Sequence, residues 1–273
     1  IIGAIYWLVY ARKPVVDLYC LKDRNFAISS LLMAGMAMIL YGSSVVIPQL
    51  AQQDLGYTAT WSGLVLSPGA VLIVLTIPLV LKLMPVVQTR WIIAFGFTCL
   101  AVSFFWSRTL TPDIDFETLV LFRSAQSLGL GFLFVPLTTI AFISIPRRLN
   151  ADAAALFTMF RNVAGSVGIS LSTAAITERS QAHSAHLAYH ASPFNEQFQQ
   201  AIRESAQAIQ NFTTQVGDPT GIATGRMYQT MIEQSRILAY IDVFTILSAV
   251  ALLLIPFCLL LSPVKSEGSA GAH

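Results

Sequence analysis

Residues 26–50 read FAISSLLMAGMAMILYGSSVVIPQL and contain no charged side chain. A helix of this length, rising about 1.5 Å per residue, crosses a bilayer hydrocarbon core about 30 Å thick. The apolar residues do not alternate with a period of two, so the segment does not fit a strand of a transmembrane β-barrel. A helix also satisfies its own backbone polar groups, which lipid cannot do. The stretch therefore predicts a membrane-spanning helix.

Further segments of the same character predict an all-α transmembrane fold. They are residues 62–83, 91–107, 118–145, 151–176 and 237–261. The chain is 55% hydrophobic and only 11% charged, whereas a soluble domain carries about 25% charged residues. Residues 1–11 are also apolar but are too few to cross the bilayer, so we expect them to be the end of a truncated transmembrane helix. The net charge of +2 gives no reason to expect nucleic-acid binding.

Basic residues divide the connections between the spans into two alternating sets. One set contains residues 12–25, the connections around Arg90 and around Arg147, and Lys265, and all of these carry Lys or Arg. The other short connections contain only Arg108. Because short cytoplasmic loops are enriched in Lys and Arg, we expect residues 12–25 to be a cytoplasmic loop and residues 262–273 a cytoplasmic tail.

Residues 177–236 then form an external helical loop. Apolar residues recur in it at i+3 and i+4 spacing between Phe194 and Val216, which is typical of an amphipathic helix. The apolar face of that helix either docks another protein or lies against the bundle or the outer leaflet.

Short motifs follow one another in a specific order along nearly the whole chain. They include PVVDL at residues 14–18, KDRNF at 22–26, GLVLSPG at 63–69, Arg123 with Gln126, FVP at 134–136, Arg161-Asn162, and AYID at 239–242. This ordered set resembles the EmrB/QacA-type drug:proton antiporters, which are 14-helix members of the major facilitator superfamily. The resemblance implies a C-terminal helix bundle of six complete spans. Transporters are commonly built from helix-bundle repeats with the substrate site between them, so we expect the N-terminal half of the same transporter as a partner.

The resemblance also implies a function. It implies proton-driven export of hydrophobic toxic compounds by alternating access across the bacterial cytoplasmic (inner) membrane, with the proton gradient as energy source and no cofactor. Its implied partners are the lipid bilayer, hydrophobic small molecules and, in cells with two membranes, a periplasmic adaptor protein and an outer-membrane channel. Export of an endogenous metabolite, lipid or siderophore, and a non-transporting membrane scaffold, are the alternatives. The spans contain no paired acids and no His-rich cluster, so we expect neither an enzyme nor a metal site.

Polar residues inside the spans are the candidates for a substrate or proton pathway. A charge at the centre of a spanning helix costs roughly 2.5–3.5 kcal/mol, so it normally faces the bundle interior. Arg161 and Asn162 lie near mid-depth, where they either line the central cavity or lock two helices together. Arg123 shares a helix face with Gln126, three residues later. It either faces the pathway or extends its guanidinium to the external interface.

Asp242 lies about a turn and a half from the external end of the last span. A carboxylate in a low-dielectric surrounding holds a proton more readily than one in water, so Asp242 is a candidate for proton exchange. The alternative is a helix-end pairing with Arg236 or the backbone. His183, His186 and His190 share one side of a helix, and we expect them to be solvated polar residues rather than metal ligands.

Prolines within the spans are candidate hinges. Proline removes one helical hydrogen bond and kinks the helix, and neighbouring helices in a membrane protein can satisfy the freed groups. Pro68 with Gly69, and Pro136, are therefore either bending points for alternating access or sites of static curvature.

Overall fold

The computed structural model describes residues 18–109, 114–190, 196–212 and 218–261, and this part of the chain is helical throughout its regular structure. The α-helices are α2 (Arg24–Gln49), α3 (Ala59–Leu83), α4 (Thr89–Phe105), α5 (Phe116–Ile143), α6 (Asn150–His190), α7 (Glu196–Phe212) and α8 (Pro219–Leu259). Short helical turns lie at η1 (Leu18–Lys22), η2 (Leu50–Asp54), η3 (Trp106–Thr109) and η4 (Arg147–Leu149). The expected truncated helix at residues 1–11 and the expected tail at 262–273 lie outside the described residues.

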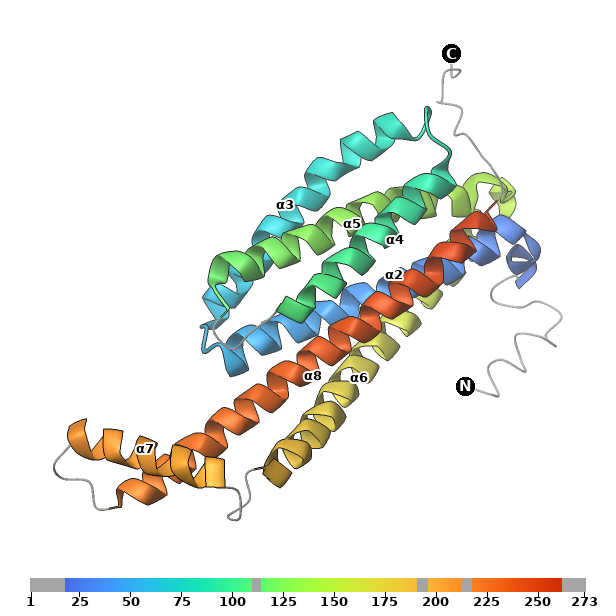
Figure 1. The fold of residues 1–273 in the computed structure, drawn as a ribbon. Helices are drawn as coiled ribbons and strands as arrows, with labels where there is room; N and C mark the ends of the chain where they lie inside the picture. The colour runs from blue at the N-terminus through green and yellow to red at the C-terminus, as the bar shows by residue number, and fades with distance from the viewer. Residues whose placement is uncertain (1–17, 110–113, 191–195, 213–217, 262–273) are drawn as a thin grey trace.

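Within the described residues, six helical segments are long and apolar enough to cross a membrane, which confirms the predicted all-α transmembrane fold. Two of these helices are longer than predicted. α6 continues to His190, beyond residue 176, and α8 begins at Pro219, well before residue 237. Each has 41 residues and is therefore about 60 Å long. They project beyond the other helices at one end of the molecule (Figure 1).

α7 lies at this projecting end, which we call the α7 end. Its apolar face packs on the first turns of α8, in a small cluster separate from the main core (Figure 1). The cluster is formed by Ile202, Ala206 and Ala223, with Phe198, Ile209 and Met227 around them. The amphipathic pattern of the predicted external helix is thus used within the chain itself.

The spanning helices form a bundle in which α2 packs mainly against α6, and α5 packs against both α3 and α4. α8 closes the arrangement by packing on α4 and α6 (Figure 1). In the most apolar part of each spanning helix, only 22% of the residues of α3 and of α6 are buried, against 50–56% in the other four helices. These two helices therefore present the largest uncovered apolar faces of the bundle.

Aromatic rings and glycines hold the helices close together. Phe104, Phe122 and Phe244 bring α4, α5 and α8 into contact, with ring centroids 5.3–6.3 Å apart. Gly129 of α5 faces Gly96 of α4 so closely that a Cβ added at Gly129 would lie 3.0 Å from the Gly96 carbonyl oxygen. Small residues at such crossings allow helix backbones to approach each other in membranes.

Capping and proline chemistry explain the course of α2. Asp23 caps its start by accepting a hydrogen bond from the Phe26 backbone N–H at 2.8 Å, as N-cap residues do. Pro48 lies within its last turn, where it lacks an N–H and crowds the preceding turn. The α-helix then gives way to the wider π-helical turn η2, which ends at Asp54 on the α7 end of the bundle.

Candidate functional site

A buried polar cluster lies where α2, α3 and α5 meet. Arg123 of α5 is only 7% exposed, and Gln126, one turn further on, is completely buried. Arg123 Nη1 donates hydrogen bonds to Gln126 Oε1 at 3.1 Å and to Ser43 Oγ of α2 at 3.4 Å. The shared helix face predicted for Arg123 and Gln126 is therefore seen as a direct hydrogen bond. The guanidinium points into the bundle and does not extend to the interface.

Several donors of this cluster have no acceptor. Buried Arg123 Nε, Gln126 Nε2 and Ser127 Oγ have no hydrogen-bond partner among the described residues. Gly69 of α3 packs directly on them, since a Cβ at this position would collide with Ser127 Oγ and lie 3.5 Å from Arg123 Cγ. The predicted hinge residue Gly69 thus covers the same cluster from the neighbouring helix.

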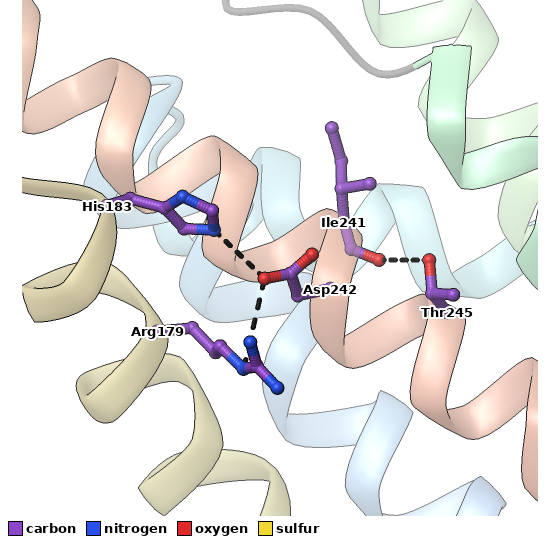
Figure 2. Close-up of polar contacts among 5 residues, drawn as sticks. All are labelled: Arg179, His183, Ile241, Asp242 and Thr245. Carbon is purple, nitrogen blue, oxygen red and sulfur yellow. Dashed lines mark hydrogen bonds and ion pairs between the residues drawn. The ribbon is translucent and has the colours of Figure 1, made fainter. Parts of the chain in front are cut away.

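Asp242 of α8 forms a second cluster with two residues of α6, as Figure 2 shows. His183 Nε2 is hydrogen-bonded to Asp242 Oδ2 at 2.9 Å, and Arg179 Nε lies 3.9 Å from the same oxygen. The side chains are partly exposed, at 35% for Asp242 and 30% for His183. In the part of the chain that the structure describes, no group of three or more His, Cys, Asp or Glu side chains is placed to hold a metal ion.

The depth of Asp242 follows from the packing of α8 on α4. Ser248 Oγ of α8 donates a hydrogen bond to the Ala101 carbonyl at 2.8 Å. Asp242 precedes Ser248 by six residues, and it therefore lies about 9 Å closer to the α7 end. This places Asp242 level with η3, the short turn that follows α4, where the bundle meets its projecting part.

The alternative pairing of Asp242 with Arg236 is wrong. Arg236 Nη1 instead donates to Asp54 Oδ1 at 3.3 Å, tying α8 to the end of η2. The Asp54 side chain is 0% exposed, whereas that of Arg236 is 43% exposed. Six residues of an α-helix turn about 600°, so Arg236 and Asp242 point in different directions. This spacing could have excluded the pairing from sequence alone.

Arg161 and Asn162 lie on the uncovered side of α6. Arg161 is half-buried and its buried Nε has no partner among the described residues, while Asn162 is exposed. They do not join the Arg123 cluster, which α2, α3 and α5 form. The nearby apolar side chains of α6, Met159, Val163 and Val167, are 45–58% exposed. This polar pair therefore belongs to a largely apolar open face.

The predicted hinge prolines lie within continuous helices. α3 remains α-helical through Pro68, and α5 remains α-helical through the buried Pro136. Near Pro136, Thr138 and Thr139 both donate hydrogen bonds to the Val135 carbonyl, at 2.8 and 2.9 Å. Side-chain hydroxyls that bond the preceding turn favour bending of a helix, so this segment combines two features that weaken regular helical bonding.

At the end opposite α7, an apolar pocket of about 320 Å³ opens between α3, α4 and α5. It is lined by Leu83, Val87, Trp91, Ile92, Phe95 and Phe132. Its lining is apolar, so its chemistry matches hydrocarbon rather than a polar or charged ligand.

Comparison with known proteins agrees with this architecture. The sequence profile of the Major Facilitator Superfamily matches residues 4–169. The chain belongs to the major facilitator superfamily. It is therefore a multi-pass membrane protein of a transporter family, in which lipid surrounds the apolar faces of its helices.

Curated relatives of this superfamily member include multidrug export proteins. The chain is 31% identical to multidrug export protein EmrB of Escherichia coli K12 over 272 residues, which is 98% of the chain and 52% of that relative. It is 34% identical to EmrB of Haemophilus influenzae over 196 residues, 71% of the chain and 38% of the relative. It is 27% identical to the fatty acid resistance protein FarB of Neisseria gonorrhoeae over 267 residues, 98% of the chain and 51% of the relative.

These similarities confirm the resemblance to EmrB-type exporters stated from the motifs. The chain spans about half the length of the curated relatives it matches. The clusters around Arg123 and Asp242 thus belong to one helix bundle of a superfamily member. Sequence reasoning missed the partners Ser43, Asp54 and His183, because each lies far along the chain from the residue it contacts.

Proposed function

We propose that this helix bundle works with a second bundle of similar size in a proton-driven exporter of hydrophobic toxic compounds. The observation that carries the proposal is the similarity to EmrB-type multidrug export proteins over nearly the whole chain, together with the half-length coverage of those relatives. The uncovered apolar faces of α3 and α6 support it, because they offer large surfaces for packing against another bundle.

In this proposal the substrate passes between the two bundles. α2 and α5 line this pathway, and α3 and α6 lie on either side of them. Alternating access then arises from rocking of one bundle against the other. Pro68, Gly69 and Pro136 are the positions at which α3 and α5 bend. Arg123, Gln126, Arg161 and Asn162 are polar groups of the pathway.

We place the α7 end outside the cytoplasm and the opposite end, with the C-terminus, inside it, in the inner membrane of a bacterium. The support is the distribution of basic residues. Lys82, Arg90, Arg147 and Arg148 all lie at the end opposite α7, where the positive-inside rule puts cytoplasmic connections. The projecting parts of α6, α7 and α8 then form a platform on which a periplasmic adaptor protein docks and leads to an outer-membrane channel.

Asp242 is our candidate for proton exchange in this bundle. It carries a carboxylate at the junction of the bundle and the projecting part, and its partner His183 is itself a titratable group. Both residues keep some contact with water, so protons can reach them from the α7 end. Movement of α6 relative to α8 would break or form their hydrogen bond, which couples protonation to the arrangement of the helices.

Proteoliposomes containing the transporter with both bundles test the function. We expect an imposed proton gradient to drive ethidium transport, and ethidium addition to release protons. A protonophore should abolish both signals, whereas transport that is unaffected by the protonophore would refute proton coupling.

The variant Asp242→Asn tests the role of the carboxylate. We expect it to lower proton-coupled efflux at equal expression, because the amide keeps the shape of the side chain but cannot carry a proton. Glu204→Gln on the exposed surface of α7 is a matched control that removes a carboxylate elsewhere. Unchanged proton release in Asp242→Asn would remove Asp242 from the proposal.

Export of lipid-like compounds is the second candidate function. The observation that favours it is the similarity, over nearly the whole chain, to a protein named for fatty acid resistance. Competition between ethidium and a medium-chain fatty acid for transport in the same proteoliposomes distinguishes the two, because an exporter of cationic drugs alone would show no competition.

A further inference from the structure

Arg123 is a buried cation without a counter-charge in the described residues. The residue is only 7% exposed to solvent. The ion pairs formed by the described residues join Asp242 to Arg179 and His183, and Asp54 to Arg236. Arg123 is in none of them. Its hydrogen-bond acceptors, Ser43 Oγ and Gln126 Oε1, are both neutral.

A buried guanidinium in this position is stabilised by an anion beside it. Arginine stays protonated under all physiological conditions, so it cannot relieve burial by losing its proton. Burial of an unpaired charge is expensive, and buried charges in proteins are normally paired. Inside a membrane span the same rule is stronger, because ionisable groups there pair with one another or line a pathway.

The unsatisfied groups around Arg123 form a set of donors. Arg123 Nε, Gln126 Nε2 and Ser127 Oγ are all buried, and none has a hydrogen-bond partner in the part of the chain that the structure describes. Ser43 Oγ donates its hydrogen to the Leu40 carbonyl at 3.0 Å and accepts a hydrogen bond from Arg123 Nη1. Its hydroxyl is therefore already used. Gln126 Oε1 also accepts from Arg123 and leaves its amide N–H groups free to donate. The donors of the cluster are therefore the guanidinium of Arg123, the amide nitrogen of Gln126 and the hydroxyl of Ser127.

This donor set matches a carboxylate. A carboxylate has two oxygens that accept several hydrogen bonds, and the guanidinium fork binds it through two parallel bonds. Gly69 closes the site on the α3 side, because a Cβ there would collide with Ser127 Oγ and lie 3.5 Å from Arg123 Cγ. The location near the start of α5 puts the site within about 11 Å of that end of the helix.

We propose that Arg123, Gln126 and Ser127 form a carboxylate-binding site at the junction of α2, α3 and α5. The carboxylate comes either from an Asp or Glu side chain of the second bundle or from an amphipathic substrate. The second bundle and the substrate both belong to the proposed function. The preference of the site for a carboxylate rests on the geometry of this bundle alone.

The substrate source is tested by equilibrium binding to the purified transporter, with both bundles present, in nanodiscs. The probes are dodecanoate and dodecanol, which share a hydrocarbon chain and differ in the carboxylate, and empty nanodiscs give the lipid background. A substrate carboxylate predicts that dodecanoate binds about 10- to 100-fold more tightly than dodecanol, as hydrogen bonds to a charged group allow. Arg123→Gln should abolish this preference, and Arg123→Lys should weaken it because the fork is lost.

The side-chain source is tested by thermal unfolding of the same transporter. Each Asp or Glu in the spans of the second bundle is neutralised singly and together with Arg123→Gln. A protein carboxylate predicts one acidic residue for which the double variant unfolds at the same temperature as the single variants, since two partners of one pair show such coupling. In that case wild-type protein binds dodecanoate no better than dodecanol.

The controls separate folding from binding. Arg108→Gln removes an exposed arginine that lies over the Phe105 ring at the end of α4, and it should change neither readout. If Arg123→Gln does not fold, Gln126→Leu replaces it and should reduce the preference or the coupling severalfold. Absence of both a carboxylate preference and coupling to any acid overturns the proposal. Neither readout needs transport, so a protein that binds carboxylate but exports nothing would refute only the proposed function.

Discussion

The crossing of α2 and α6 at Gly168 allows a sharp prediction about packing. α2 and α6 form the most extensive helix pair of the bundle. A Cβ added at Gly168 would lie 2.8 Å from Met38 Cα and 2.9 Å from the Met38 carbonyl carbon. Carbon atoms in contact prefer separations of about 3.5–4.0 Å. Because the obstacle is backbone rather than a flexible side chain, the two helices must move apart by about 1 Å to accept Gly168→Ala.

The energetic consequence can be bounded from packing rules. Overpacking of a well-packed interior costs about 1–3 kcal/mol. Replacement of glycine by alanine within a helix recovers about 0.5–1 kcal/mol of this through backbone entropy. The middles of these two ranges differ by about 1 kcal/mol, so we expect Gly168→Ala to lower the free energy of unfolding by about that amount.

Gly63→Ala is the matched control. Gly63 lies within α3 and is exposed, and a Cβ there would meet no atom within 4 Å. The same chemical change should stabilise the protein at this position by up to about 1 kcal/mol. The assay is unfolding of the purified protein by SDS in mixed micelles, followed by circular dichroism of the helices. If Gly168→Ala unfolds at the same or a higher SDS fraction than the wild type, the close helix contact is not as described and the reasoning fails.

Three further predictions follow from other contacts. Arg236→Gln leaves the buried Asp54 carboxylate without its counter-charge and should cost about 1–3 kcal/mol of unfolding free energy. Combination with Asp54→Asn should recover part of this loss in the same SDS assay, and full additivity would argue against the pair. Pro136→Ala restores a helical hydrogen bond in α5, so it should slow ethidium transport severalfold without lowering stability, whereas unchanged transport would favour static curvature. In a cysteine-free background, Gln200→Cys on α7 should react with a membrane-impermeant maleimide in intact cells and Lys82→Cys only after permeabilisation, and the reverse pattern would overturn the orientation.

The spanning helices could be predicted from sequence because one physical property determines them. Long uncharged segments such as residues 26–50 have one stable arrangement in lipid, which is a helix that crosses it. The ends of α6 and α8 were not predictable in the same way. Beyond residue 176 the sequence becomes polar, and hydropathy no longer reports helix formation. There the helices are stabilised by contacts of α6 with α8 and of α7 with α8.

The candidate site was predictable along a helix but not between helices. Three-residue spacing correctly placed Arg123 beside Gln126. The choice between a buried and an interfacial guanidinium depended on α2 and α3, whose positions beside α5 no local pattern encodes. The partner of Asp242 likewise lies 59 residues away. Proximity in sequence suggested Arg236, whereas the α-helical turn directs Arg236 toward Asp54 instead.

The ion pairs of the described residues and the buried Arg123 cation lie toward the same end of the bundle, and this has a mechanical consequence. Arg123 lies near the start of α5, Asp54 at the end of η2, and Asp242 level with η3, all toward the α7 end. The Asp54–Arg236 pair joins α2 to α8, and the Asp242–His183 pair joins α6 to α8. A motion that separates these helices at the α7 end must break or hydrate polar contacts. Toward the opposite end, the Phe26 ring of α2 contacts the rings of Phe142 of α5 and Phe157 of α6. In the proposed function, substrate or proton binding near Arg123 or Asp242 would act at the end where ion pairs join the helices.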